Sequence, residues 1–469
     1  MLHSEMPLVI HWFRRDLRIA DNSALYHASK AGGVIPVYIL SSWKKNHAWT
    51  GSNRQKFLCG CLESLSKNLE TLDSRLVIRE GNAVAVLKKL IAETGATAVY
   101  FNRDPDPFGK KTEQELSALC ADLGINCCGY DDIALHNPTE ILTQTGNPYK
   151  VYTPYSNNWL SRPKPLPLAK PSSLNTPKDI SSLELPQLSH WKLPDSVADL
   201  PEPGERAARE RMLHAISKII AYYSDKRDIP SLEATSRLSQ DLRFGLISIR
   251  TLYSKVASAL TSATGRSRTS IEIYIKELAW REFYFAILHH FPHVIDHEFN
   301  PHWTALPWDE PGENFEKWKS GNTGFPIIDA GMRQLLQTGF MHNRVRMVTA
   351  MFLTKDLHID WKLGESHFMQ HLTDGEIASN NGGWQWSAGT GADAAPYFRI
   401  QNPWSQTAKH DPTGVYIKRW IPELKAVDSK KFQAPPENNL PLALGYPIPC
   451  IDHKAERERT LAIFKKHRA

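Results

Sequence analysis

Residues 374–386 read DGEIASNNGGWQW, and this short stretch decides how the C-terminal half of the chain is interpreted. It lies in a longer segment, 340–420, that also contains FMHNRVRM at 340–347 and APYFRIQNP at 395–403. A helical core is normally built from Leu, Ile, Val and Ala, whereas this segment mixes Asn, Arg and Asp with Trp. Indole rings offer stacking area, and amide and guanidinium groups offer directed hydrogen bonds. The pattern therefore favours a binding site for a large planar ligand with polar edges. The alternative is a polar helical core with a glycine-rich turn.

The sequence around this segment has the spacing of a helical domain. Apolar residues recur with a helical period from residue 205 to about 425, for example over 212–220 and 332–350. Residues 137–204 are rich in Pro and Ser, which forbids long helices and central strands. We interpret them as an ordered connector, because the aromatic stretch 149–159 can pack on a neighbour. Residues 426–469 are Pro-rich and then basic, and we expect them on the surface of a domain spanning 205–469.

The first 136 residues alternate strand and helix patterns. Short apolar runs at 8–13, 34–40, 75–78 and 96–101 are typical of buried parallel strands, and helical patterns fall at 52–72, 82–94 and 110–123. This alternation predicts a doubly wound parallel sheet that binds a ligand beyond the carboxyl ends of its strands. No GxGxxG or GxxxxGK[ST] motif is present, so a nicotinamide enzyme is not indicated. The predicted fold class is α/β followed by an all-α domain.

Composition excludes several classes of protein. The mean hydropathy is −0.40 and no long apolar run occurs, so we expect no transmembrane helix. No secretion signal is visible, and the six cysteines lack the spacing of zinc ligands, so a reduced cytoplasmic protein without a metal site is expected. A formal charge of +6 permits a polyanionic partner without requiring one.

Several motifs resemble one known family over nearly the whole chain. They are FRRDLR at 13–18, YSDKRD at 223–228, TSRLS at 235–239, ELAWREFY at 277–284, Trp308, and the segment 340–403. Together and in this order they are similar to the DNA photolyase/cryptochrome family. The likeness is greatest to the class I cyclobutane pyrimidine dimer photolyases of bacteria.

The resemblance implies that FAD binds in the helical domain. The residues matching the family's cofactor site are Tyr223, Thr235, Ser236, Arg237, Leu238, Ser239, Arg346, Asp374, Gly375, Glu376 and Asn380. Hydroxyls and backbone N–H groups that open a helix can hold phosphates, although the 235–239 turn could equally be a plain helix N-cap. Ala234 stands where the family usually has Gly. Asn380 matches the residue that faces flavin N5, and its amide favours a repair enzyme over a cryptochrome.

The same resemblance implies an electron-transfer chain and a lesion pocket. Trp384, Trp361 and Trp308 match the chain, in order from the flavin to the surface. Glu277, Trp280, Asn343, Met347 and Trp386 match the pocket for a flipped-out dimer. A surface helix with a Glu277–Arg281 ion pair is the alternative for the first of these. The residues expected near the DNA backbone are Arg227, Arg281, Arg344, Arg399 and Gln406, with Lys409 beside them.

A light-harvesting antenna is the last feature that the resemblance implies. Arg54, Asp104, Asp106 and Arg243 resemble the site of a deazaflavin-binding antenna, and Ile295-Asp296 replaces the Cys-Lys pair of folate binders. We therefore expect 8-hydroxydeazaflavin or a second flavin rather than methenyltetrahydrofolate.

The predicted function is light-driven repair of cyclobutane pyrimidine dimers in UV-damaged DNA by a monomer without an obligate protein partner. The alternatives are a cryptochrome-type blue-light photoreceptor and, without the resemblance, a nucleotide-binding α/β protein with a helical partner domain.

Overall fold

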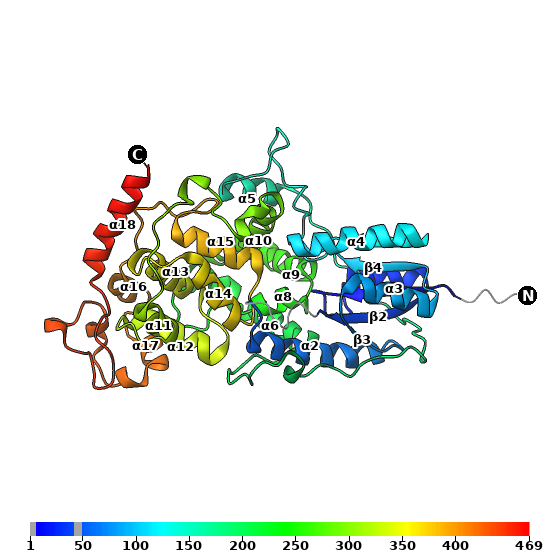
Figure 1. The fold of residues 1–469 in the computed structure, drawn as a ribbon, viewed down its shortest axis with the longest axis horizontal. Helices are drawn as coiled ribbons and strands as arrows, with labels where there is room; N and C mark the ends of the chain where they lie inside the picture. The colour runs from blue at the N-terminus through cyan, green and yellow to red at the C-terminus, as the bar shows by residue number, and fades with distance from the viewer. Residues whose placement is uncertain (1–5, 42–48, 469) are drawn as a thin grey trace, which may run out of the picture.

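A computed structural model describes residues 6–41 and 49–468 of the chain. The N-terminal part is built on a five-stranded parallel sheet in the order β3-β2-β1-β4-β5 (Figure 1). Its strands are β1 (Leu8–Phe13), β2 (Gly33–Leu40), β3 (Val77–Glu80), β4 (Ala98–Asn102) and β5 (Asn126–Tyr130). The strand order reverses between β1 and β4, so the residues that follow these two strands meet at the position where such sheets bind ligands.

Helices cover both faces of this sheet. On one face α1 (Ser23–Ala31) and α2 (Ser52–Glu70) share an apolar cluster with Val9, Phe13 and Val34. On the other, α3 (Ala83–Thr94) and α4 (Pro107–Leu123) pack with Ile10 and Ile35. The predicted doubly wound fold is therefore confirmed.

Two local differences from the predictions have clear causes. The fifth strand, β5, was not predicted, because it lies at the edge of the sheet and its Asn, two Cys and Gly give no apolar run. Helix α4 begins at Pro107 rather than near residue 110, because the Asp106 side chain accepts a hydrogen bond from the Gly109 N–H and caps the helix.

The connector is ordered against the sheet. It contains α5 (Tyr152–Ser161), and its later residues bond to the sheet where the Val34 N–H donates to the Leu174 carbonyl and the Leu183 N–H donates to that of Ile78. Trp159 and Trp191 are fully buried.

The C-terminal part is helical, as predicted. Its α-helices are α6 (Glu205–His214), α7 (Tyr223–Lys226), α8 (Ser239–Phe244), α9 (Ile249–Ser262), α10 (Gly265–His290), α11 (Glu313–Ser320), α12 (Pro326–Thr338), α13 (Asn343–Met351), α14 (Trp361–His371), α15 (Ile377–Ala388), α16 (Pro403–His410), α17 (Val415–Trp420) and α18 (His453–Arg468). No helix in the described residues is both long and apolar enough to cross a bilayer.

Three expectations about this part are corrected. The stretch 332–350 is two helices, because Gly339 ends α12 with a φ of 64° and His342 caps α13. The stretch 212–220 is not one α-helix, because α6 ends at His214 and a π-helical segment follows over Ala215–Ile219. The tail after 426 is not wholly on the surface, since Phe432, Tyr446 and Phe464 are buried.

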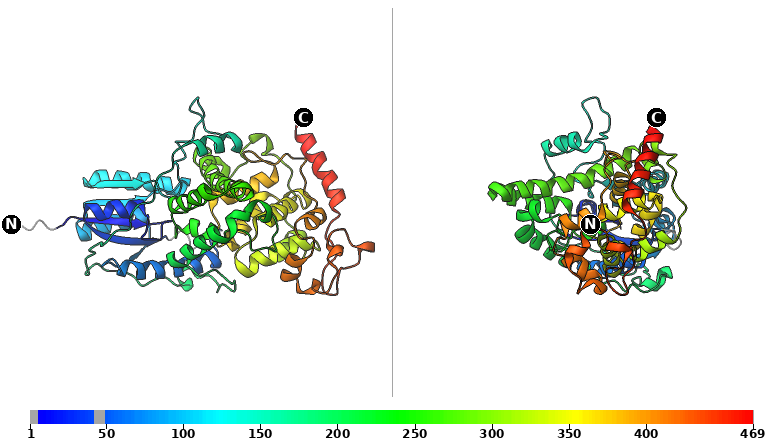
Figure 2. Two further views of the ribbon diagram at one scale, coloured as in Figure 1. Left: turned by 180° about the vertical axis from the view of Figure 1, so that it is seen from behind. Right: turned by 90° about the vertical axis from the view of Figure 1, so that its left-hand side faces the viewer.

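Helix α18 lies at the end of the molecule opposite the sheet (Figures 1 and 2).

A buried network of charged side chains joins the N-terminal and C-terminal parts of the chain. Arg250 of α9 donates to Asp21 at 2.9 Å and to Asp132 at 2.6 Å, and Arg18 donates to the same Asp132 at 2.6 Å.

Candidate functional site

The long helix α10 presents one polar and one aromatic side chain on the same face. Glu277 and Trp280 are three residues apart, which places them side by side on the helix surface. Trp280 stacks on Tyr152 of α5, with ring centroids 3.6 Å apart and ring planes 8° from parallel. Trp280 is half-buried, so this stack leaves part of the indole accessible.

Glu277 pairs with Arg227 across the domain rather than along its own helix. Burial raises the pKa of Glu277, and the Arg227 guanidinium opposes that shift. Arg281 turns the other way, since its Nη1 donates to the Ile133 carbonyl at 2.8 Å. The simple Glu277–Arg281 surface pair is therefore wrong, and Arg281 lies at the domain interface, away from the Arg227 pair.

The start of α13 lies beside the same cluster. Arg344 donates to Asp228 at 2.9 Å, and the neighbouring His410 ring bonds to the Asp228 carbonyl at 2.9 Å. Although burial alone would raise it, the pKa of Asp228 is lowered by Arg344 and Arg227. Met347 lies one turn further along α13, with its sulfur 3.7 Å from Nη1 of Arg344.

Two arginines and an aromatic ring form a cationic cradle near the start of α8. The guanidinium of Arg237 lies 3.7 Å from the centroid of the Phe340 ring, and that of Arg346 lies 5.4 Å from it. Arg346 also donates to Asp374 at 2.9 Å. One carboxylate for two guanidinium groups leaves positive charge for an anionic ligand.

The turn that leads into α8 has the shape expected of an anion-binding segment. Arg237 has a φ of 51°, a left-handed conformation that few side chains adopt. Helix α8 begins without a side-chain cap, so its first N–H groups are available. Tyr223 packs edge-to-face on Tyr274. These residues fit the phosphates and ribityl hydroxyls of FAD.

Helix α15 positions the residue expected to face the flavin. The Glu376 side chain caps α15 by accepting from the Ser379 N–H at 3.3 Å, and Asn380 Nδ2 donates to the Glu365 carbonyl at 3.1 Å. Burial raises the pKa of Glu365 to about 8. A Cβ at Gly382 would collide with the Tyr284 ring, so this glycine lets α15 approach α10 closely.

The three tryptophans of the expected chain share one apolar cluster. Trp384 and Trp361 are both buried and Trp308 is partly exposed, so Trp308 lies nearest the surface, and the order of the other two stays a prediction. Trp384 lies directly against Gly364, one turn beyond Trp361 on α14, since a Cβ at Gly364 would clash with its indole. The Asp309 N–H bonds to the His358 carbonyl at 2.7 Å, which holds Trp308 beside the turn before Trp361.

The expected antenna residues meet at the domain interface, around the loop 374–376. Arg243 Nε donates to the Gly375 carbonyl at 3.0 Å, and Arg54 Nη1 approaches it at 3.4 Å. A Cβ at Gly375 would collide with Arg54. Burial lowers the pKa of Arg54 to about 9 and that of Arg243 to about 10, and a neighbouring guanidinium adds to each shift.

Arg15 links this loop to the sheet. It donates to Asp104, after β4, at 2.9 Å and to Glu376 at 3.2 Å. Burial and the neighbouring Asp104 raise the pKa of Asp106 to about 7. The structure therefore brings Arg54, Asp104, Asp106 and Arg243 into one cluster, and their role as an antenna site stays a prediction.

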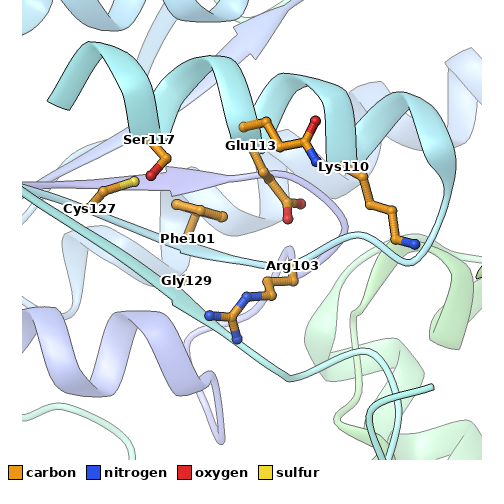
Figure 3. Close-up of a pocket in the computed structure, with 8 residues that line it drawn as sticks. Phe101, Arg103, Lys110, Glu113, Ser117, Cys127 and Gly129 are labelled. Carbon is orange, nitrogen blue, oxygen red and sulfur yellow. The ribbon is translucent and has the colours of Figure 1, made fainter. Parts of the chain in front are cut away.

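Two hollows lie beside this cluster, under α4. The larger, about 370 Å³, is lined by Phe101, Arg103, Lys110, Glu113, Gln114, Ser117, Cys127 and Gly129. Figure 3 shows Lys110 and Glu113 projecting from α4 toward the strand ends, opposite Arg103. The smaller hollow, about 80 Å³, shares these three charged residues and adds Asp104 and His289.

The remaining predicted residues are placed on the surrounding elements. Asn343 is exposed at the start of α13, and Trp386 is half-buried on α15. Arg399 is exposed before α16, and Gln406 lies one turn before His410 on that helix. Sequence reasoning missed Arg15 as an interface residue, Phe340, and Tyr152, since their partners Asp104, Arg237 and Trp280 are far from them in sequence.

Comparison with known proteins agrees with this arrangement. Residues 9–173 match the family model described as DNA photolyase, and residues 274–466 match the FAD binding domain of DNA photolyase. The chain belongs to the DNA photolyase family. The predicted family, its FAD-binding domain and its enzyme class are thereby confirmed at the level of the family.

Individual relatives of this photolyase-family chain cover its full length. It is 39% identical to a deoxyribodipyrimidine photo-lyase of Synechococcus, over 98% of this chain and 97% of that one. A class III photolyase from Agrobacterium tumefaciens matches with a TM-score of 0.92 and 38% identity, covering 100% and 99% of the two chains. An archaeal photolyase from Sulfolobus tokodaii with two FAD molecules matches with a TM-score of 0.86 and 31% identity, covering 98% and 100%. Because one relative is a class III enzyme, the likeness to class I stays a prediction.

Proposed function

We propose that this protein repairs cyclobutane pyrimidine dimers in DNA, using light and reduced FAD. The observation that carries the proposal is the face of α10, where Glu277 and the accessible part of Trp280 lie together beside Arg227. An aromatic wall and a directed polar group are what a flipped-out pyrimidine pair requires. When bound, FAD supplies the one-electron chemistry that splits the cyclobutane ring.

The residues of the chain bind and orient in this proposal. The 235–239 turn, Arg237 and Arg346 would hold the diphosphate side of FAD, and Asn380 would lie beside its ring. Glu277 presents its carboxyl group to the pyrimidine edge, and burial raises its pKa while Arg227 opposes that shift. Met347 and Trp386 complete the apolar side of the pocket, with Asn343 at its rim.

DNA is held through its backbone. Arg344 lies on α13 beside Asp228, Gln406 and Lys409 lie on α16, and Arg399 precedes that helix. Cationic contacts to phosphates give sequence-independent affinity that weakens with salt. Arg281 contributes at the domain interface instead, because its guanidinium is bonded to Ile133.

The antenna proposal rests on the cluster of arginines at the interface. Buried guanidinium groups with lowered pKa values favour an acidic chromophore. We propose 8-hydroxydeazaflavin or a second flavin there, held by Arg54 and Arg243, with methenyltetrahydrofolate less favoured. The Sulfolobus relative, described as holding two FAD molecules, supports a flavin.

A cryptochrome-type photoreceptor is the second candidate function. A cryptochrome from Synechocystis has a similar fold, with a TM-score of 0.88 and 27% identity over 99% of this chain and 100% of that one. The presence of Glu277, Trp280 and Asn380 favours repair. We further propose a cytoplasmic monomer, with an antenna domain over 1–136, a connector over 137–204 and the FAD domain over 205–469.

The test uses an oligonucleotide carrying one thymine dimer, mixed with photoreduced protein without oxygen. Under blue light, absorbance of the restored bases should rise, and in darkness it should not. Glu277→Ala and Trp280→Ala should lose most of this recovery. Glu272→Ala, an exposed carboxylate on the same helix, and Trp303→Phe, which packs near α18, are the matched controls. Tight flavin binding without recovery in the unaltered protein would refute repair and favour the photoreceptor.

A further inference from the structure

A buried carboxylate lies against the middle tryptophan of the chain. Glu298 is 2% exposed, and its Oε1 accepts a hydrogen bond from the indole Nε1–H of Trp361 at 3.1 Å. Trp361 itself is fully buried. Burial of an ionisable carboxyl group is costly, so its placement on one indole N–H calls for an explanation beyond packing.

The other buried indoles of this region have different partners. The Nε1–H of Trp384 has no hydrogen-bond partner within the described part of the chain. The Nε1–H of Trp318 donates to the Thr349 carbonyl at 3.1 Å. An amide carbonyl oxygen is too weak a base to accept the proton of an oxidised indole, whereas a carboxylate oxygen can accept it. Of these three indoles, Trp361 therefore has a proton acceptor in direct contact.

The surroundings of Glu298 leave room for that proton. Its second oxygen, Oε2, is buried and has no hydrogen-bond partner in the described residues. Lys362 Nζ lies 3.7 Å from Oε1 and 3.9 Å from Asp360, and its side chain is 37% exposed. The Glu298 carboxyl is thus screened from water on the Trp361 side and adjoins a partly exposed cation on the other.

We propose that Glu298 takes the indole proton of Trp361 when that residue is oxidised. The oxidant is the indole radical cation of Trp384, formed when light-excited oxidised flavin withdraws one electron from it. One electron moves from Trp361 to Trp384, which restores neutral Trp384 and leaves Trp361 as a radical cation. Its N–H bond then breaks, the proton forms an O–H bond on Glu298, and Trp361 becomes a neutral radical. Recombination is then slowed, because an electron that returns to Trp361 must be accompanied by return of the proton from Glu298.

The inference deepens the proposed function, since it rests on the flavin of that function and on the tryptophan chain that the family resemblance implies. It concerns only how the chain holds an oxidised site and does not involve DNA. The experiment therefore follows the tryptophan radical itself rather than repair of a dimer.

The test is transient absorption of the flavin-loaded protein after a light pulse, without DNA. Trp308→Phe is introduced first, so that the oxidised site stays on Trp361. Radical cation and neutral radical of Trp absorb at different wavelengths, so the proton loss is observed directly. In the Trp308→Phe background we compare Glu298, Glu298→Gln and Glu298→Asp. Gln keeps a carbonyl acceptor for the indole N–H but cannot take the proton.

Glu298→Gln should lengthen the lifetime of the radical cation about 100-fold, the lower range of what a positioned acid–base group supplies. It should also abolish the solvent isotope effect on that step, and Glu298→Asp should restore both in part. Lys362→Met, which leaves the carboxylate in place, should still convert cation to neutral radical. Equal cation lifetimes with Glu298 and Gln would overturn the proposal alone. No tryptophan radical in the unaltered protein would overturn both it and the proposed electron chain.

Discussion

The tryptophan cluster and the domain interface treat charge in opposite ways. Around Trp361 and Trp384 the packing is apolar, with Phe368 at 4.9 Å and Gly364 in direct contact with Trp384, and Glu298 is the buried carboxylate beside Trp361. At the interface, arginines and carboxylates are buried together. Arg15, for example, contacts two carboxylates. Ion pairs join the two halves of the chain at the interface, whereas the tryptophans pack mainly against apolar side chains, with Glu298 and Glu365 as buried carboxylates nearby.

The largest expected effect comes from breaking the charged region. Arg250→Ala leaves Asp21 and Asp132 without their shared cation and should lower the free energy of unfolding by about 4 kcal/mol. The measurement is urea unfolding followed by circular dichroism. The control is Arg206→Ala, whose exposed pairs with Glu202 and Glu210 should contribute under about 1 kcal/mol. Equal losses in both variants would contradict the importance of burial.

The apolar region should be sensitive to volume instead of charge. Gly364→Ala inserts a methyl group against the Trp384 indole and should cost about 2 kcal/mol through overpacking. Gly383→Ala, in the neighbouring helix and with nothing within 4 Å of its Cβ, should be neutral or slightly stabilising. Thermal unfolding and indole fluorescence together measure the effect. An unchanged fluorescence in Gly364→Ala would show that Trp384 does not depend on this contact.

The interface should also respond to pH. Because the pKa of Asp106 is raised to about 7 in the folded protein, its contribution to stability is present at low pH and is lost as pH rises from about 4 to about 7. Over this window the free energy of unfolding of Asp106→Asn should fall by about 2 kcal/mol less than that of the unaltered protein. Asp122→Asn is the control, since that residue is exposed on the same helix. Parallel pH profiles for unaltered protein and Asp106→Asn would refute the shift.

The smallest expected effect is on the salt dependence of DNA binding, which tests the charged groups around Asp228. Arg344→Gln should reduce the salt dependence of DNA binding by about one phosphate contact, with little change in stability. Fluorescence anisotropy with a labelled duplex at several salt concentrations measures the slope. Arg206→Gln, which removes an exposed cation of α6 that pairs with Glu202 and Glu210, should leave the slope unchanged. A slope that Arg344→Gln does not alter would place this residue away from the DNA backbone.

Much of the fold could be predicted from sequence because its signals are local. The apolar runs of β1, β2 and β4 and the helical spacing after residue 205 depend only on neighbours in the chain. Strand β5 was missed because Cys127, Cys128 and Gly129 form an edge, where apolar side chains are not required. The break at Gly339 was missed because a helical period continues on both sides of it.

The candidate site divides in the same way. The residues of the cofactor site and the lesion pocket came from motifs, and the structure adds the long-range pairs between them. Arg227 and Glu277 are 50 positions apart, and Arg15 and Glu376 are 361 apart. No periodicity or propensity connects such residues, so only the folded chain shows that they form ion pairs.

The position of Arg15 has a thermodynamic consequence. Its guanidinium contacts Asp104, which follows β4, and Glu376 in the loop 374–376. One side chain therefore binds a carboxylate from each half of the chain. Any molecule that competes for either carboxylate changes the free energy of the other contact. By linkage, two such occupants must alter each other's affinity by the same factor, and the sign of that coupling can be measured from either side.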